Sequence, residues 1–408
     1  MTSPDRNVES DMLPLRTVSL DDITTVNKFS HLLDVGRDGE MKKFLHEESI
    51  TTDATPSYLT GNIPYFGNGI IPSISSNING RYKTSPSATI VVPDAVFYPR
   101  SSLIVDRFGQ VPSANFRYIP QWGDINTVDS NVTRIGDIYH VDASPFKGPP
   151  SDETQDVIIC GSTIASNNYG HFLFDGLALC MLQANHIDLR PAKLFFPPLT
   201  RWQREILELL GLLEFVSEIE KPIYSRRIIT NSQVSGAVFA PSRFCRTVFD
   251  TLKFIVGSDD SASELVYLRR SPDAKRGLRN QATMEQLLEA KGFRIVEPDR
   301  LSVREQILSL SRARLIVGQA GAGMANACFA PVGASILEIM PDKYPDVWMR
   351  HASRQIGLNW HLFVCEVQEE DIRYNVNPLW PNATHFTFDV PLDLLEEAIT
   401  TVSKFRGF

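Results

Sequence analysis

The sequence lacks the motifs of several common enzyme classes. It has no G-x-x-x-x-G-K loop, no G-x-S-x-G elbow and no D-x-D pair at the end of a predicted strand. These absences argue against a Walker-type nucleotidase, a serine hydrolase and a metal site built on paired aspartates. The eight histidines and five cysteines also show no metal-ligand spacing, so we expect no bound metal.

Cysteine pairs and long apolar runs are missing as well. The five cysteines are scattered and none forms a C-x-x-C pair; they are Cys160, Cys180, Cys245, Cys328 and Cys365. Three of them lie in apolar runs, where free buried thiols are expected. No run approaches the ~20 apolar residues that span a bilayer, and the first residues do not resemble a secretion signal. We therefore expect a reduced, cytoplasmic compartment, with peripheral membrane contact through a surface patch left open.

Positive charge is scarce over the chain as a whole. The formal net charge is −8 and the pI is about 5.6, which argues against nucleic acid as a partner, because nucleic-acid binding needs a basic face. With 408 residues, the chain is long enough for two domains with separate cores. The sequence does not indicate an oligomeric state.

The pattern of the chain changes along its length and predicts four regions. Residues 1–84 have weak periodicity and form an N-terminal extension, with one helix expected near Leu20–Leu33. Residues 85–240 form an N-terminal lobe that begins with short β-like runs typical of hairpins. Residues 241–390 form a C-terminal lobe that binds the ligand, and residues 391–408 form an amphipathic helix that packs back onto a lobe. From Asp156 onward strand and helix patterns alternate, which predicts α/β lobes with parallel sheets.

A basic segment follows one of these predicted strands. The strand Leu265–Arg270 runs into a turn with five positive charges, opposed in sequence only by Asp273; the five are Arg269, Arg270, Lys275, Arg276 and Arg279. Guanidinium groups bind phosphate oxygens through paired hydrogen bonds, so this cluster favours an anionic ligand, with Arg270 and Arg276 as the preferred contacts. The alternative is a solvated basic turn, the commoner fate of a charge run.

A glycine-rich loop follows another predicted strand. The run Leu315–Gly318 leads into Gln319–Gly323 and then into a helix of small residues. Gly321 and Gly323 lack Cβ atoms, so the backbone amides of Gly321, Ala322 and Gly323 could approach an anion at the start of this helix. The alternative is a tight turn that serves only packing. Downstream, Glu338 at the end of its strand could accept hydrogen bonds from ribose hydroxyls.

A third candidate site lies upstream. His171 and Asp175 are four residues apart, so on one helix they share a face near its N-terminus. Neutral His171 or ionised Asp175 could remove a proton from a hydroxyl group. The alternative is a histidine that is part of the core, beside Phe172 and Phe174.

Several motifs in this order resemble glycosyltransferase family 61. The corresponding segments are Asn168–Gly176, Tyr267–Arg270, Lys275-Arg276, Asn280-Gln281, Glu305–Ile307, Val317–Asn326 and Ile336–Ile339. The resemblance covers about Asp156 to Ile339. One position departs from the family pattern, because Ala320 stands where the family usually has histidine in the glycine loop.

The resemblance implies an α/β, GT-B-like fold, with two Rossmann-like lobes, a central cleft and a β-rich, partly irregular N-terminal region. It implies an inverting, metal-independent hexosyl- or pentosyltransferase without a cofactor, acting on a nucleotide-sugar donor and a glycan or lipid-linked glycan acceptor. A bacterial cytoplasmic enzyme of capsule or other surface polysaccharide assembly fits this pattern.

Roles for individual residues also follow from the resemblance. Arg270, Arg276, Asn326 and the backbone of Gly321 to Gly323 would bind the donor diphosphate side, and Glu338 would contact the ribose. His171 and Asp175 would serve the acceptor. Two other interpretations stay open: a non-catalytic nucleotide- or glycan-binding protein that retains the fold, and a nicotinamide-dependent oxidoreductase suggested by the glycine loop alone.

Overall fold

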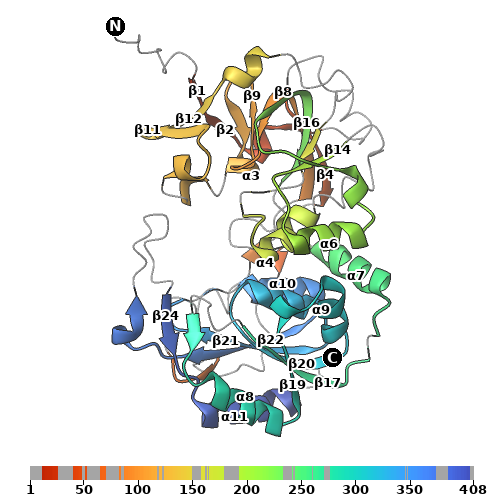
Figure 1. The fold of residues 1–408 in the computed structure, drawn as a ribbon, viewed down its shortest axis with the longest axis vertical. Helices are drawn as coiled ribbons and strands as arrows, with labels where there is room; N and C mark the ends of the chain where they lie inside the picture. Colours follow the sequence, from red (N-terminus) through yellow and green to blue (C-terminus); the bar gives the residue numbers. More distant parts are fainter. Residues whose placement is uncertain are drawn as a thin grey trace. The chain divides into compact units, whose positions relative to one another are not determined.

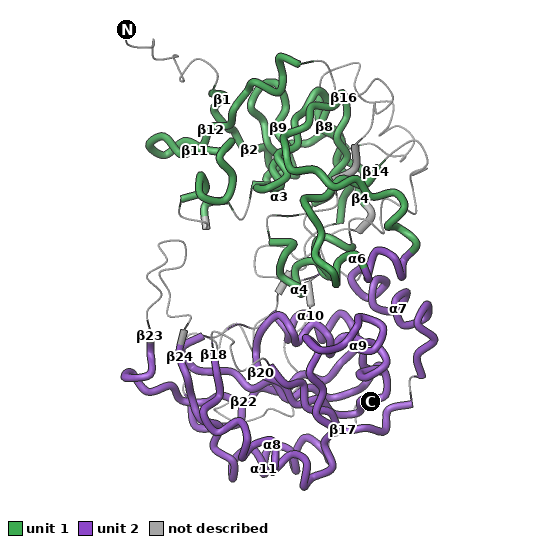
Figure 2. Tube along the Cα trace, in the orientation of Figure 1, with its two compact units in different colours: residues 1–48, 86–204, 211–234 green, residues 49–85, 205–210, 235–408 purple. Residues whose placement is uncertain are grey.

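The computed structural model divides the chain into two compact units (Figure 2). It describes residues 12–25, 40–47, 51–52, 65–69, 82–83, 87–116, 119–121, 124–148, 158–160, 163, 165–178, 193–232, 241, 244–259, 261–270, 276–344, 346, 348–373 and 385–404. Unit 1 comprises residues 1–48, 86–204 and 211–234, and unit 2 comprises residues 49–85, 205–210 and 235–408. Both units are discontinuous in sequence, and residues of the first 84 contribute strands to each of them.

Unit 1 is built on a mixed sheet with the strand order β15-β14-β13-β16-β8-β4-β3. Its strands are β3 (Thr24–Thr25), β4 (Lys42–Glu47), β8 (Ser87–Tyr98), β13 (Ile158–Cys160), β14 (Lys193–Phe196), β15 (Val216–Glu218) and β16 (Ile223–Asn231), and β9 (Leu103–Asp106) pairs with β8. Strands β13 to β16 pair in parallel, whereas β8 pairs antiparallel with β16, β4 and β9. The predicted parallel sheet is therefore confirmed for the part of unit 1 after Asp156.

Smaller elements complete unit 1. They are β1 (Met12–Pro14), β2 (Arg16–Val18), η2 (Leu20–Asp22), β10 (Gln110–Pro112), α3 (Ser113–Phe116), η4 (Ile119–Gln121), η5 (Ile125–Thr127), β11 (Val132–Ile135), β12 (Ile138–Asp142), η6 (Ser144–Lys147), α4 (Tyr169–His171), the π-helix η7 (Phe172–Gly176) and η8 (Leu213–Phe215). Helix α6 (Arg201–Leu209) begins in unit 1 and ends in unit 2. The hairpins β8–β9 and β11–β12 confirm the predicted β-rich segment.

Unit 2 is built on a six-stranded sheet with the order β19-β17-β20-β21-β22-β6, in which every neighbouring pair is parallel. The strands are β6 (Phe66–Gly67), β17 (Glu264–Leu268), β19 (Phe293–Val296), β20 (Ala313–Gln319), β21 (Ser335–Pro341) and β22 (Asn359–Cys365). A second sheet joins β18 (Arg276–Leu278), β24 (His385–Phe388) and β23 (Ile372–Arg373), and β5 (Thr51–Thr52) pairs with β7 (Tyr82–Lys83).

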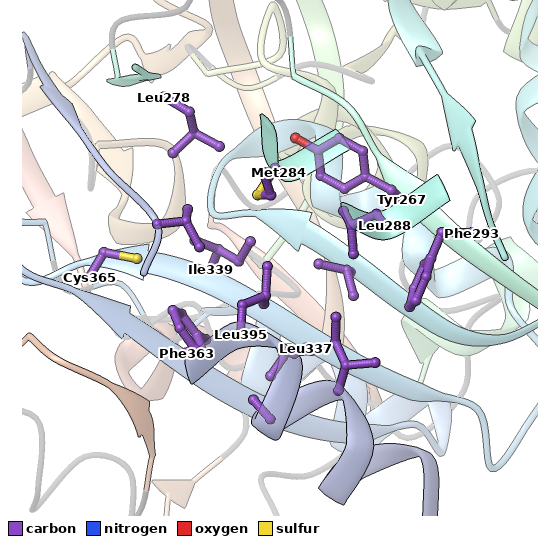
Figure 3. Close-up of a cluster of buried hydrophobic side chains, with 14 of the residues drawn as sticks. Tyr267, Leu278, Met284, Leu288, Phe293, Leu337, Ile339, Phe363, Cys365 and Leu395 are labelled. Carbon is purple, nitrogen blue, oxygen red and sulfur yellow. The ribbon is translucent and has the colours of Figure 1, made fainter. Parts of the chain in front are cut away.

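Helices cover both faces of the six-stranded sheet (Figure 1). The helical elements of unit 2 are α7 (Phe244–Val256), α8 (Gln281–Ala290), η9 (Pro298–Arg300), α9 (Val303–Leu310), η10 (Ala322–Phe329), α10 (Trp348–Ile356), η11 (Glu369–Asp371) and α11 (Leu392–Lys404). Helices α8 and α11 pack on one face, where Leu288 and Leu395 meet Leu337, Ile339 and Phe363 (Figure 3). Period-2 alternation in the strands directs these side chains to one face and Glu338 to the other.

Two local predictions about the first half of the chain are wrong. The predicted helix near Leu20–Leu33 is a single 3-10 turn followed by strand β3, within the part that is described. Asp21 and Asp22 open the turn after the capping residue Ser19, but the β-branched Ile23, Thr24 and Thr25 then favour extended backbone. The sequence pattern also predicts two separate β-like runs, 88–92 and 95–98, on either side of Pro93. They form one twelve-residue strand, β8, in which Pro93 lies between the residues that pair with β4 and those that pair with β9.

Candidate functional site

The strand order of unit 2 defines a topological switch point. After β17 the chain forms β19 on one side of β17, and it then forms β20 on the other side. In open parallel sheets, ligands bind beyond the carboxyl ends of the strands at such a point. Arg269 and Arg270 follow β17, and Ala320 and Gly321 follow β20. The two loops that were singled out in the sequence therefore lie together at the switch point.

Arg270 lies directly against the glycine loop. Its Nη1 donates a hydrogen bond of 2.6 Å to the carbonyl oxygen of Ala320. Gly321 has a φ of +152°, and a Cβ atom there would lie 2.5 Å from Nη1 of Arg270. Only glycine combines this backbone conformation with so close an approach. Gly321 is therefore required by the close approach of a guanidinium within the protein, and the predicted approach of an anion to its backbone stays a prediction.

Gly323 occupies a different environment in the same loop. No atom lies within 4 Å of the position that a Cβ would take, and the residue is exposed. Ala322 and Gly323 open helix η10, whose first amides have no partner within the helix. The space beside Gly323 and these amides is therefore available to a ligand.

Arg276 begins the neighbouring strand β18 and is held at two points. Its guanidinium carbon lies 3.9 Å from the centroid of the Tyr344 ring, a cation–π contact. Its carbonyl oxygen accepts a hydrogen bond from Nε2 of Gln319, at the end of β20. The side chain is only 8% exposed, and its Nε has no hydrogen-bond partner in the described part of the chain. A buried N–H donor without an acceptor costs free energy, because it has lost its hydrogen bonds to water. A bound anion would supply the missing acceptor.

Arg270 and Arg276 influence each other electrostatically. Burial, followed by the charge of Arg276, lowers the pKa of Arg270 to about 10, while Asp299 acts in the opposite direction. Among the described residues neither guanidinium forms an ion pair with a carboxylate. Two partly buried cations without a paired anion favour the binding of an anion between them.

The two other described arginines of the segment are compensated. Arg269 forms ion pairs with Glu285, at 3.0 Å, and with Glu297. Arg279 forms ion pairs with Asp371 and with Asp389, the latter at 2.7 Å. The excess of positive charge predicted from the local sequence is therefore smaller in space and is confined, among the described residues, to Arg270 and Arg276, since the carboxylates that pair with Arg269 and Arg279 come from distant parts of the chain. Lys275 and Asp273 lie outside the described residues.

Glu338 and Asn326 are both buried. Glu338 is 0% exposed and lies in the middle of β21, which continues to Pro341, so its predicted place at the end of the strand is wrong. Trp360 Nε1 donates a hydrogen bond of 2.7 Å to Oε2, while Oε1 has no partner among the described residues. Burial raises the pKa of Glu338 to about 8. Asn326 is 1% exposed within η10. Their roles toward a ligand stay predictions.

His171 and Asp175 form a hydrogen-bonded pair in unit 1. Asn168 caps the helix, accepting hydrogen bonds from the amides of Gly170 and His171, and the chain then widens into the π-helix η7. His171 Nδ1 lies 2.9 Å from Asp175 Oδ2, which confirms that the two side chains share a helix face. Asp175 is fully buried, whereas the side chain of His171 is 25% exposed. The carboxylate can therefore orient the ring and favour a proton on Nδ1.

A comparison with known protein families identifies the family to which this part of the chain belongs. The model of the family described as glycosyltransferase 61 matches residues 169–337. Those residues are a glycosyltransferase 61 domain. The match lies within the range Asp156–Ile339 and confirms the resemblance in the motifs, and sugar transfer is the activity class of this domain. No curated protein matches the chain.

The glycosyltransferase 61 domain contains most of the candidate residues. It includes the His171–Asp175 pair, both uncompensated arginines and the glycine loop, and it ends one residue before Glu338. Tyr344 lies beyond the matched segment and was missed in the sequence, because a single tyrosine after a strand carries no signal. Gln319 was named only as the start of the glycine loop, and its contact with Arg276 was not expected.

Three further observations concern the described part of the chain as a whole. Cys245, Cys328 and Cys365 are buried free thiols, as predicted from their apolar surroundings. Within the described residues, no cluster of three or more histidine, cysteine, aspartate or glutamate side chains could hold a metal ion. None of the helices in this part of the chain has both the length and the apolar character to cross a membrane.

Proposed function

We propose that the protein is an inverting, metal-independent glycosyltransferase. It moves a sugar from a nucleotide-sugar to a hydroxyl group of a glycan or lipid-linked glycan, in the cytoplasmic assembly of a capsule or another surface polysaccharide. The observation that carries this proposal is the pair of uncompensated guanidiniums, Arg270 and Arg276, beside Gly321 at the switch point. The GT-B arrangement, with a cleft between two lobes, is part of the proposal.

The arginine pair fits the leaving group of such a reaction. When the bond between the anomeric carbon and the diphosphate breaks, negative charge grows on the diphosphate oxygens. Arg270 and Arg276 are preorganised by Ala320 and Tyr344, so they can stabilise this charge without reorganising. The amides that open helix η10 would add donors to the same group. This arrangement supplies the positive charge that many sugar transferases take from a metal ion.

The His171–Asp175 pair fits the acceptor side. With Asp175 holding Nδ1, the Nε2 atom of His171 would take the proton of an acceptor hydroxyl. The hydroxyl oxygen would then attack the anomeric carbon from the face opposite the diphosphate, and the configuration at that carbon would invert. The nucleoside diphosphate would leave with the bonding electron pair.

Donor binding is tested by a thermal-shift panel of UDP, GDP, CDP, CMP and NAD in the presence of EDTA. A ligand that binds only the folded state raises the melting temperature. We expect one nucleoside diphosphate to stabilise the protein without metal, and Arg270→Ala to abolish the shift. Stabilisation that requires Mg²⁺ would contradict the metal-independent mechanism. A shift with NAD alone would favour the oxidoreductase interpretation.

The acceptor side is tested by kinetics with the donor that this panel identifies. Asp175→Asn and His171→Gln should each lower turnover about 100-fold, the range of general-base catalysis, with donor affinity unchanged. Wild-type turnover in both variants would remove the pair from catalysis. Donor binding without turnover in the wild-type protein, across a wide acceptor panel, would favour the second candidate function, a non-catalytic binding protein. The departure at Ala320 motivates this second candidate.

A further inference from the structure

A cavity of about 490 Å³ lies beside the switch point, on the outer side of β17. Its walls come from β19, which is an edge strand of the sheet, and from the residues that follow it up to helix α9. Ile295, Val296 and Leu301 provide apolar surface, and Arg269, Glu297 and Arg300 provide polar groups. The volume is within the range of small-molecule sites.

This cavity is next to Arg270 along the backbone. Arg269 lines the cavity, and the next residue, Arg270, contacts the glycine loop. The amide of Arg269 donates a hydrogen bond of 2.9 Å to the carbonyl oxygen of Val296, at the end of β19. Asp299, in the turn after β19, is close enough to Arg270 to affect its pKa. The cavity therefore lies close to Arg270, on the side where the nucleoside of a ligand with its diphosphate at Arg270 could be placed.

The charges of the cavity are balanced, in contrast to those at Arg270. Arg269 pairs with Glu285 and Glu297, and Arg300 pairs with Glu297 at 2.7 Å. A third arginine of the wall, Arg294, pairs with Glu264 at 2.7 Å. Three arginines thus face three glutamates, so the cavity does not require a second anion. A neutral ligand with a flat apolar face and hydrogen-bonding edges suits it better.

Glu297 is placed to accept hydrogen bonds from such a ligand. It follows β19, the strand that comes next after β17 in this sheet and pairs with it, and dinucleotide-binding folds carry an acid that binds ribose hydroxyls after a strand in this relation to the phosphate-binding strand. Its side chain is 26% exposed, whereas Glu338 has no exposed surface. The ion pairs with Arg269 and Arg300 hold its carboxylate in one orientation.

We propose that this cavity binds the nucleoside of the donor, with the carboxylate of Glu297 accepting hydrogen bonds from the ribose and the apolar wall packing on the base. The proposal rests on the proposed function, since it assumes a diphosphate at Arg270 and Arg276. It assigns the ribose to Glu297 rather than to Glu338.

The experiment measures affinities of UDP, GDP, CDP and ADP, of their 2′-deoxy and 3′-deoxy counterparts, and of inorganic pyrophosphate. In the wild-type protein, loss of one ribose hydroxyl should weaken the preferred nucleotide about tenfold, as for a hydrogen bond to a charged group. In Glu297→Gln the ribo- and deoxynucleotides should differ less than threefold, while pyrophosphate affinity stays within twofold of wild type. Glu264→Gln, which removes another glutamate partner of a wall arginine, is the matched control and should retain the tenfold difference.

The outcomes separate this inference from the proposed function. An undiminished preference for the ribonucleotide in Glu297→Gln would overturn the ribose assignment and leave the diphosphate site intact. Loss of that preference in Glu338→Gln instead would return the ribose to Glu338. If wild-type protein binds neither pyrophosphate nor any nucleotide, the proposed function fails and the nucleoside cavity fails with it. A parallel melting curve of each variant shows that it is folded.

Discussion

Four arginines of one short segment divide into two kinds. Arg269 and Arg279 each have two carboxylate partners, whereas Arg270 and Arg276 have a carbonyl oxygen and an aromatic ring. All four are equivalent in a count of local charge. The difference arises from acids that are distant in sequence, such as Glu297 and Asp389. The fold brings them next to Arg269 and Arg279 but not next to Arg270 and Arg276.

This division separates structural arginines from binding arginines. A guanidinium that is satisfied within the protein gains little from a phosphate, because the phosphate must displace its carboxylates. A partly buried guanidinium without such a partner is already desolvated, so an incoming anion recovers interaction energy at little further cost. We therefore expect ligand binding to depend on Arg270 and Arg276, and folding to depend on Arg269 and Arg279.

The largest effect is expected for Arg270→Ala. Loss of a charge-assisted, two-pronged contact costs about 2–3 kcal/mol, so the affinity for a nucleoside diphosphate should fall about 100-fold. Arg279→Ala is the matched control and should change this affinity less than twofold, because its partners are Asp371 and Asp389. Isothermal titration of both variants makes the comparison. An equal loss of nucleotide affinity in both variants would show that arginines with and without carboxylate partners do not differ in ligand binding.

The glycine loop gives a second contrast. Gly321→Ala should lower the free energy of unfolding by about 1–3 kcal/mol, because its backbone has a φ of +152° and a Cβ would collide with Arg270. Gly323→Ala should leave stability within about 0.5 kcal/mol, since the space around it is open. Urea unfolding measures both. A Gly323→Ala variant as unstable as Gly321→Ala would contradict the described loop geometry.

Tyr344 tests how Arg276 is held. Tyr344→Ala should weaken pyrophosphate binding about tenfold, because a desolvated cation–π contact contributes about 1–2 kcal/mol to the position of the guanidinium. Tyr344→Phe keeps the ring and should bind nearly as wild type. If Phe and Ala at this position are equally weak, the hydroxyl group and not the ring is responsible.

The smallest effect concerns Glu338, a buried carboxyl group without a cationic partner among the described residues. Burial raises its pKa from 4.5 to about 8 in the folded state. Between these values the folded protein holds a proton that the unfolded chain has released, so stability should fall as the pH rises through this window. Glu338→Gln should make the pH dependence of the melting temperature shallower between pH 5 and 8.

The control for Glu338 is a carboxylate with the opposite shift. Hydrogen bonds from Ser302 lower the pKa of Glu305 in the capping box of α9. Above about pH 5 the carboxylate of Glu305 makes its full contribution to the free energy of unfolding. Glu305→Gln should therefore lower the melting temperature by the same amount at pH 5 and pH 8. If Glu338→Gln leaves the slope of melting temperature against pH unchanged between pH 5 and pH 8, Glu338 does not titrate in that range.

Much of this site follows from local sequence, and the rest depends on long-range contacts. Alternation of apolar runs predicted the parallel sheet of unit 2, and helical spacing predicted the contact between His171 and Asp175. Glycine after a strand predicted the close approach at Gly321. The partners of Arg269 and Arg279, the ring of Tyr344 and the burial of Glu338 come from residues far apart in the chain, for which local periodicity carries no information.

The contribution of residues 1–84 illustrates the same limit. Their weak pattern predicted an extension, yet β4 pairs with β8 in unit 1 and β6 pairs with β22 in unit 2. Strand β6 is only Phe66–Gly67, too short for its periodicity to be recognised. Gly67 adopts a φ of +99° against the backbone of Val364, a contact that only the folded sheet defines.

The most direct measurement is ¹⁵N NMR of the arginine Nε–H groups during a titration with inorganic pyrophosphate, with resonances assigned from single Arg→Lys variants. Nε of Arg276 has neither a hydrogen bond nor a paired carboxylate in the described part of the protein, whereas Nε of Arg269 lies 3.0 Å from Glu285, so the Arg276 resonance should shift most, together with that of Arg270. The resonances of Arg269 and Arg279 should stay in place. Shifts at Arg269 or Arg279, with Arg270 and Arg276 unchanged, would show that the uncompensated pair is not the diphosphate site.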